Sequence, residues 1–114
     1  MSILTADSAV ILRAGYVVDK YGNPSTVRDW ANATRTTVSG VSIQPDSSSE
    51  ETGDRSAVVT GWRIQSRKGQ DLDLLRTDRV EFDGMTLEVD GKVARYRMAG
   101  AVHHVEARLK EVEG

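Results

Sequence analysis

Alternation of apolar and polar residues is clearest between positions 79 and 98, where the chain reads RVEFDGMTLEVDGKVARYRM. Two Asp-Gly pairs, Asp83-Gly84 and Asp90-Gly91, interrupt the alternation. Asp-Gly is a preferred pair for the two-residue type I′ turn of a β-hairpin, because both turn positions need a positive φ. The stretch therefore predicts a three-stranded antiparallel meander.

The register of this meander follows from its two predicted turns. The first turn places Phe82 opposite Met85 and Val80 opposite Leu87, and the second places Leu87 opposite Ala94. One face is then apolar, with Val80, Phe82, Met85, Leu87, Val89, Ala94, Tyr96 and Met98. The other face belongs in solvent or against a polar partner, and it carries Arg79, Glu81, Thr86, Glu88, Arg95 and Arg97.

The N-terminal third predicts one strand followed by a long connection. Residues 8–18 are rich in β-branched residues, and the expected inward face consists of Val10, Leu12, Ala14 and Tyr16. Residues 19–35 contain the turn residues Gly22, Asn23 and Pro24 and read as an extended loop. Trp30 in this loop has two interpretations. It caps one end of the core, or it anchors a partner, since tryptophan is enriched at interface hot spots.

The middle of the chain predicts two strands separated by a polar excursion. In residues 36–44, Val38 is out of phase with Val41, and a β-bulge or bend at Ser39-Gly40 restores the phase. Residues 46–55, DSSSEETGDR, contain no apolar side chain, so they cannot offset their ordering entropy by burial, and we expect a mobile loop over 44–55. The strand resumes over 56–66, with its inward side chains being Val58, Trp62 and Ile64.

The remaining segments complete an all-β domain. Residues 69–78, GQDLDLLRTD, fit either one helical turn or an apolar plug over a barrel mouth. Residues 102–112 also fit helical spacing, but a strand with Val105, Ala107 and Leu109 inward is preferred because a barrel needs closing. We therefore predict one domain over 1–114, a small antiparallel β-barrel of about six strands with long loops at 19–35 and 44–55, with a β-sandwich as the alternative.

Composition adds few constraints on function. Apolar residues make up 39% of the chain and charged residues 28%, and the net charge of −2 does not favour a nucleic-acid-binding domain, which is usually basic. The chain has no cysteine, which excludes disulfides and thiolate metal sites. The longest apolar run near the N-terminus, 9–12, is too short for a signal peptide or a membrane span, so we expect a cytosolic protein without membrane contact.

The residues that could support catalysis are sparse. Ser47, Ser48 and Ser49 lie in the polar loop without the elbow motif that positions a nucleophile. His103 and His104 are adjacent on a predicted strand, so their side chains should point to opposite faces and not share a metal. Aromatic residues, at 5%, are too few for an exposed stacking platform. We therefore predict neither an enzyme nor a cofactor or metal site.

Three segments together carry a resemblance to a known family: TRTTVSGVSIQPDSSSEE at 34–51, TDRVEFDGMTLEVDGKV at 77–93 and VHHVEARLKEVEG at 102–114. They resemble the head-to-tail stopper, or head-closure, proteins of tailed bacteriophages that infect actinobacteria. The resemblance implies a structural protein of the virion neck that is made in the host cytoplasm. Its subunits, small β-barrels, form a ring of about twelve copies. The ring lies below the portal and adaptor, retains the packaged double-stranded DNA and docks the tail terminator or tail tube.

In such stoppers a long loop between barrel strands projects toward the central channel. The resemblance places this channel or gating loop at Gln44, Pro45, Asp46, Ser47, Ser48, Ser49, Glu50, Glu51, Thr52, Gly53, Asp54 and Arg55. Contacts in a closed ring join different surfaces of neighbouring copies. The candidates for such a subunit or partner interface are Trp30, Arg79, Glu81, Glu88, Arg95 and Arg97.

Two other classes of function compete with the stopper. A tail terminator or adaptor belongs to the same connector complex, although adaptors are usually rich in helix. A free nucleic-acid-binding β-barrel is the second alternative, and salt-dependent binding of DNA by the isolated chain would favour it.

Overall fold

The computed structural model describes residues 7–48 and 58–112 of the chain. In these ranges one short 3₁₀ turn, Trp30–Asn32, accompanies nine β-strands. The strands are β1 (Asp7–Arg13), β2 (Tyr16–Val18), β3 (Pro24–Arg28), β4 (Thr34–Ser48), β5 (Val58–Ser66), β6 (Arg79–Phe82), β7 (Met85–Val89), β8 (Ala94–Met98) and β9 (Ala101–Glu111).

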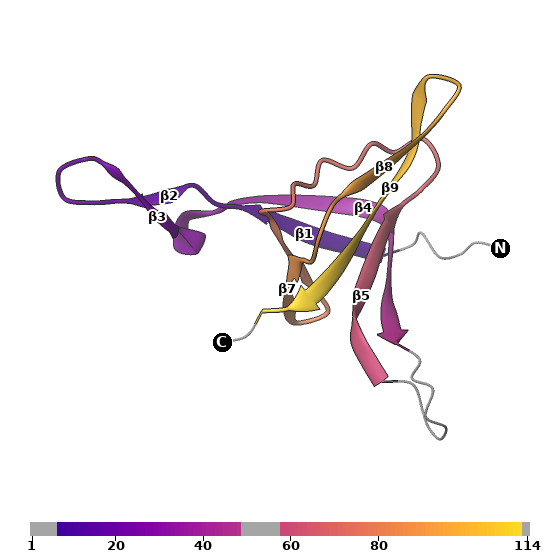
Figure 1. Ribbon diagram of the computed structural model, residues 1–114, viewed down its shortest axis with the longest axis horizontal. Helices are drawn as coiled ribbons and strands as arrows, with labels where there is room; N and C mark the ends of the chain where they lie inside the picture. Colours follow the sequence, from indigo (N-terminus) through magenta and orange to yellow (C-terminus); the bar gives the residue numbers. More distant parts are fainter. Residues whose placement is uncertain (1–6, 49–57, 113–114) are drawn as a thin grey trace.

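Six of these strands close into an antiparallel barrel (Figure 1). Their order is β5-β4-β1-β6-β7-β9, and β9 pairs back with β5 to complete the circle. Strand β8 extends the sheet beyond the barrel, and among the described residues β2 pairs only with β3. The predicted small antiparallel barrel of about six strands is therefore confirmed.

The barrel interior is filled by alternate strand residues and by two leucines from a connection without regular structure. Ile64, Leu87 and Val105 are fully buried, and Leu72 and Leu74 from residues 69–78 belong to the same cluster. Of the two predictions for that connection, the apolar plug is thus correct and the helical turn is wrong. The predicted inward positions of β9 and β5 are also confirmed, except that the side chain of Val58 lies outside the described residues.

The β6–β7 hairpin has the predicted register. Val80 pairs with Leu87 and Phe82 with Met85. The turn between them has φ values of 52° at Asp83 and 78° at Gly84, as a type I′ turn requires. The local signal of Asp-Gly between alternating residues was therefore sufficient here.

The second predicted turn of the meander is wrong. Strand β7 does not pair with β8, because both strands pair with β9, one after the other, along the same side of it. Asp90-Gly91 lies between the end of β7 and the start of β8. The Asp90 N–H donates to the Arg108 carbonyl in β9, 2.8 Å away. The reversal occurs at Ala99-Gly100 instead, with φ values of 55° and 82°. A positive-φ glycine serves a bulge as well as a turn, so the local signal is the same.

The strand phases at the N-terminal end of the barrel are partly as predicted. The bulge expected at Ser39-Gly40 is present, since the β1–β4 register shifts there and Gly40 has φ 72°. The predicted inward face of the first strand is correct only in part. Leu12 and Ala14 are buried, but Tyr16 is 45% exposed, and Ala9 and Ile11 belong to the core cluster while Val10 does not. Ala9 lies opposite Val38 and Ile11 opposite Thr36 in β4, and residues directly opposite each other share a face of the sheet.

The long connection predicted over 19–35 is mostly a hairpin. Strands β2 and β3 form a two-stranded ribbon, called the arm below and defined as residues 16–28, which extends away from the barrel (Figure 1). The Arg28 guanidinium donates to the Ala14 carbonyl at 2.9 Å, and the Asp29 N–H donates to the Gly15 carbonyl at 2.8 Å. These bonds fix the base of the arm to the end of β1.

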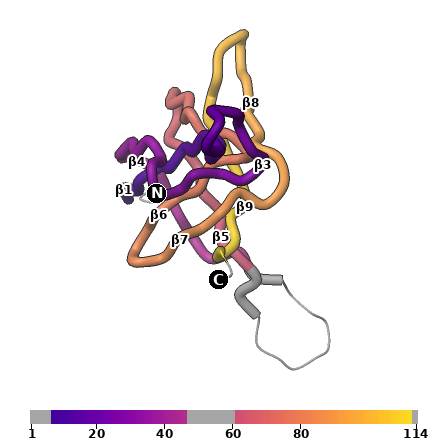
Figure 2. Tube along the Cα trace, turned by 90° about the vertical axis from the view of Figure 1, so that its left-hand side faces the viewer, coloured from indigo at the N-terminus to yellow at the C-terminus, as the bar shows by residue number. Residues whose placement is uncertain are grey.

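Two further hairpins project from the barrel in opposite directions. The β8–β9 turn points to one side, and the open end of the β4–β5 ribbon points to the other, in both Figure 1 and Figure 2. Part of the predicted 44–55 loop is thus strand: Gln44 to Ser48 belong to β4 and pair with β5 as far as Val58. Pairing to a neighbouring strand orders this stretch without apolar burial. Ser49 to Arg55 lie outside the described residues.

Candidate functional site

The predicted charged face does not form one surface. Arg79, Glu81 and Glu88 lie together on the outside of β6 and β7, where Arg79 pairs with Glu88 across the strands. Glu81 accepts from the Arg35 guanidinium of β4 at 2.5 Å. Trp30 is half-buried beside them and does not belong to the core cluster, and the Arg79 guanidinium lies 4.2 Å from the centre of its ring. Four of the six residues predicted for an interface, Trp30, Arg79, Glu81 and Glu88, therefore lie close together on the outside of the barrel.

Arg95 and Arg97 are separated from that surface because β8 continues β7 instead of turning back along it. The Arg95 Nε donates to the Asp71 carboxylate at 3.1 Å, and its Nη2 donates to the Leu72 carbonyl at 3.2 Å. Arg95 therefore fastens the plug segment to β8. Arg97 is exposed on the same strand. The alternate residues Tyr96 and Met98, predicted to face the core, are 48% and 62% exposed.

The described part of the predicted channel loop is held by ion pairs. The Asp46 carboxylate lies 2.9 Å from the Arg108 Nε and 3.8 Å from the Arg63 Nη2. Arg63 also contacts Glu106 at 3.2 Å. The charge of Asp46 is thus balanced by two guanidinium groups on β5 and β9, and this residue stiffens the base of the β4–β5 ribbon.

A buried carboxylate anchors the other end of the plug, and no pattern in the sequence predicted its burial. Asp78 is 1% exposed and accepts from the Leu75 N–H and from the Arg13 Nη2, each at 2.8 Å. Arg13 also contacts the exposed Asp73 at 3.1 Å. Hydrogen bonds to the two carboxylates raise the pKa of Arg13, and the guanidinium lowers the pKa of Asp73. The arginine therefore stays charged and ties residues 73–78 to β1.

The two histidines do not point to opposite faces, so that prediction is wrong. The β8–β9 register shifts by one residue at this point, with Tyr96 opposite His104 and Arg97 opposite Val102. This bulge brings the Nδ1 atoms of His103 and His104 to 2.9 Å, and the His104 Nε2 lies 2.7 Å from a Glu106 oxygen. Among the described residues no cluster of histidine and carboxylate side chains has the arrangement of a metal site.

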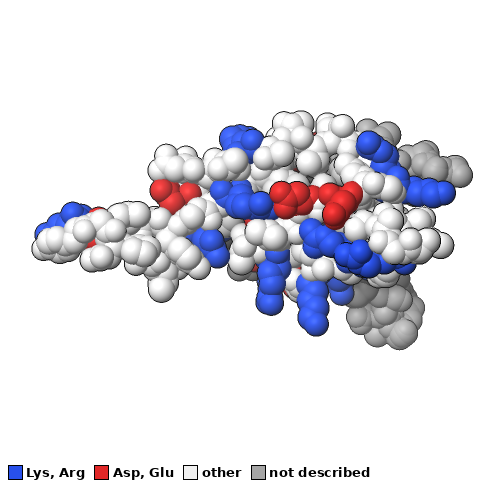
Figure 3. All heavy atoms as spheres, turned by 90° about the horizontal axis from the view of Figure 1, so that it is seen from above, with Lys and Arg blue, Asp and Glu red and all other residues white. Residues whose placement is uncertain are grey.

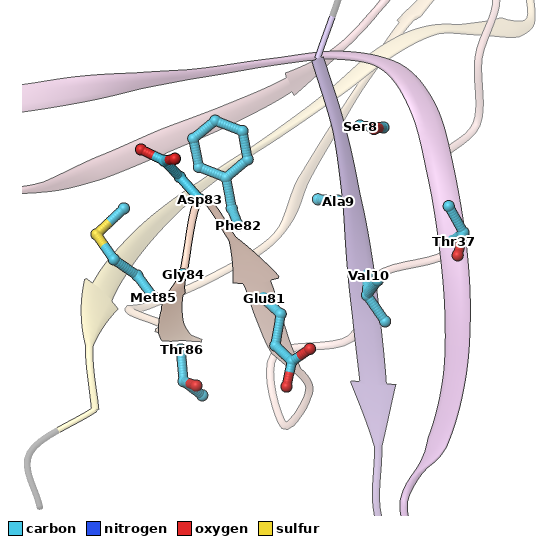
Figure 4. A pocket seen from close by; sticks show the side chains of 10 residues that line it. All are labelled: Ser8, Ala9, Val10, Thr37, Glu81, Phe82, Asp83, Gly84, Met85 and Thr86. Atoms are coloured by element: carbon cyan, nitrogen blue, oxygen red, sulfur yellow. The ribbon is translucent and has the colours of Figure 1, made fainter.

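A groove of about 430 Å³ runs between β1 and the β6–β7 turn (Figure 4). Phe82 and Met85 contribute apolar surface, Glu81 and Asp83 contribute carboxylates, and Thr86 lines the same groove. No histidine or lysine lines it. The groove therefore presents carboxylates beside apolar surface, a combination that suits binding of a cationic or aromatic group.

Most of the large exposed apolar side chains lie on the projecting hairpins. On β8 they are Tyr96 and Met98, and on the arm they are Tyr16, Val17, Val18, Tyr21 and Val27. Figure 3 shows basic and acidic side chains interspersed along the barrel, while much of the arm carries no charge. Contiguous exposed apolar side chains are typical of surfaces that contact another protein. The sequence placed Tyr16 on the inward face, which is wrong, and did not single out Tyr21.

No protein-family model and no curated protein matches this chain. One similar solved structure is the solution structure of protein SF1141 from Shigella flexneri 2a, a structural genomics target. The two chains align with a TM-score of 0.63 and 20% identity, over 97% of this chain and 96% of the other. This likeness establishes a shared fold. Within the described residues, no helix has the length and apolar character needed to cross a membrane.

Proposed function

We propose that this protein is a head-to-tail stopper of a tailed bacteriophage, a structural subunit of a ring in the virion neck. The proposal starts from the resemblance of three sequence segments, and one structural observation supports it most. A rigid closed barrel carries projecting hairpins whose exposed side chains include Tyr21 and Met98. Closure pairs the barrel strands with each other, so association with neighbours uses the projections.

The β4–β5 ribbon supports a role at the channel. Its two strands pair out to Ser48 and Val58. The chain between these ends contains Glu50, Glu51 and Asp54. Carboxylates in the segment that connects the two strands repel DNA phosphates and would favour passage of DNA over tight binding. In the ring, this ribbon points toward the lumen.

Loss of the gene in a phage that encodes it tests the proposal. We expect lysates with unattached tails of normal length and with heads that have released their DNA, and we expect the wild-type gene supplied in trans to restore virions. Overlong tails would identify a tail terminator instead. Normal virions in the absence of the protein would exclude a role in the neck. A reconstruction of the neck that places residues 44–55 on its outer surface would contradict the channel assignment.

A further inference from the structure

We propose that the tip of the arm, Lys20 and Tyr21, inserts into the groove beside the β6–β7 turn of a second copy of this chain. This inference rests on the proposed ring and identifies the contact between its subunits. The inserted tip is cationic and aromatic, and the receiving groove is acidic and partly apolar.

The tip of the arm is held in one conformation. The Asp19 carboxylate accepts from the N–H groups of Tyr21 and Asn23, at 2.8 and 2.9 Å, and Gly22 closes the turn with φ 85°. Tyr21 is 75% exposed, and the Lys20 ammonium lies 5.3 Å from the centre of its ring. An aromatic side chain on a rigid turn loses little entropy on binding, so it can serve as an anchor.

The arm also needs a partner for its own stability. A two-stranded ribbon without a third strand or a covering layer is marginal in water. Both of its long edges are unpaired in the described structure, and it exposes Tyr16, Val18 and Val27 by 45%, 58% and 61%. Burial against a neighbouring barrel would remove this apolar surface from water.

The groove complements the tip in charge and in shape. Asp83 makes no ion pair among the described residues, so its carboxylate can receive the Lys20 ammonium, whereas Glu81, which also lines the groove, is already paired with Arg35. Lys20 likewise makes no ion pair within the described chain. Phe82 and Met85 offer apolar surface for a tyrosine ring, and the volume of about 430 Å³ is typical of clefts that hold a ligand, roughly 300–1,000 Å³.

The geometry favours a second copy over the same chain. The arm extends along the longest dimension of the molecule, 55 Å, with its tip far from the barrel that carries the groove (Figure 1). Its base is fixed by the bonds of Arg28 and Asp29. Tip and groove are different surfaces, so each copy uses one to donate and the other to receive. Such a heterologous contact builds a ring when the rotation between copies closes.

Disulfide trapping tests this contact, because the natural chain has no cysteine. Two full-length variants, Asn23→Cys and Thr86→Cys, are mixed and mildly oxidised; both positions are exposed, and Asn23 lies in the turn of the tip, so Lys20 and Tyr21 are kept. We expect a heterodimer that joins the two variants to predominate over either homodimer. The matched control replaces Thr86→Cys by Asp90→Cys, which is equally exposed but lies outside the groove, and it should cross-link severalfold less.

A charge variant sharpens the test. Lys20→Glu in the Asn23→Cys background should reduce the heterodimer severalfold while leaving the thermal unfolding midpoint unchanged, because Lys20 is exposed. Equal yields at positions 86 and 90, homodimers through residue 23 alone, or no cross-link would overturn the proposal. The stopper function is tested separately by the virion phenotype. If sedimentation shows rings but the cross-link does not form, the proposed contact is refuted and the stopper function is not. If the cross-link forms but virions made without the protein are normal, the stopper function is refuted and the contact is not.

Discussion

The barrel interior and the arm use similar residue types in opposite ways. Leucine, valine and isoleucine fill the barrel with almost no exposed surface, whereas valine and tyrosine on the arm remain largely exposed. Barrel strands have neighbours on both edges, while β2 and β3 have only each other as partners within 7–48 and 58–112. This difference separates residues that maintain the fold from residues available for association. Substitutions in the barrel should lower stability, and substitutions on the projections should change assembly.

The largest expected effect is in the plug. Leu74→Ala removes a fully buried side chain from the core cluster, and we expect the free energy of unfolding to fall by about 3 kcal/mol. Its neighbour Leu75 is 44% exposed and provides the matched control. Leu75→Ala should cost less than about 1 kcal/mol. Urea unfolding of both variants measures the difference, and equal losses would contradict the plug.

Asp78, which anchors the plug, should contribute somewhat less to the free energy of unfolding than Leu74. Asp78→Asn leaves the Arg13 guanidinium without its buried partner, and the expected loss is about 2 kcal/mol. The loss is below that of a fully buried pair because the Arg13 side chain is 39% exposed and keeps Asp73. Denaturant unfolding at neutral pH measures it. A loss no larger than that of Asp73→Asn would show that burial of Asp78 adds nothing.

The exposed ion pair between Arg13 and Asp73 predicts that the stability of the protein depends on pH. Arg13 lowers the folded-state pKa of Asp73 below its ordinary value of 3.8. Asp73 therefore adds stability above pH 3.8, and this contribution disappears as the pH falls through the lowered pKa. The stability difference between wild type and Asp73→Asn should be small at pH 7, because Asp73 is 79% exposed, and should vanish in strong acid. A difference that grew on acidification would have the wrong sign.

The two arginines of β8, Arg95 and Arg97, should differ in how much they contribute to stability. Arg95→Ala loses the contacts with Asp71 and the Leu72 carbonyl, and we expect about 0.5–1 kcal/mol of destabilisation. Arg97→Ala should change stability by less than about 0.5 kcal/mol. Thermal unfolding of the two variants compares them. If Arg97 affected folding as strongly as Arg95, this difference would be absent.

The smallest effect should be a gain in stability at the β8–β9 turn. Ala99 has φ 55°, a conformation that costs an L-residue with a Cβ about 1 kcal/mol. Ala99→Asn creates an Asn-Gly pair suited to this turn and should stabilise the protein by about 0.5 kcal/mol. The control is Asp83→Ala in the β6–β7 turn, which should destabilise by a similar amount. Calorimetric unfolding can resolve both signs.

The sequence was informative where a local pattern has one structural solution. Phe82-Asp83-Gly84-Met85 specifies a hairpin and its register, and the phase change around Gly40 specifies a bulge. The inward residues of β9, such as Val105, followed from strict alternation once a strand was chosen. Side-chain direction along a strand has a period of two, so these features need no knowledge of distant residues.

The tertiary structure decided the features that depend on a partner far along the chain. Asp90-Gly91 could close a hairpin or lie where the chain continues along one neighbour, and the backbone bond to Arg108 in β9 holds it in the second arrangement. Three other features also follow from that pairing or from closure of the barrel. They are the contact between His103 and His104, the burial of Asp78 beside Arg13, and the separation of Arg95 from Arg79. Alternation specifies which residues share a strand face, but hydrogen bonding between distant strands determines what that face meets.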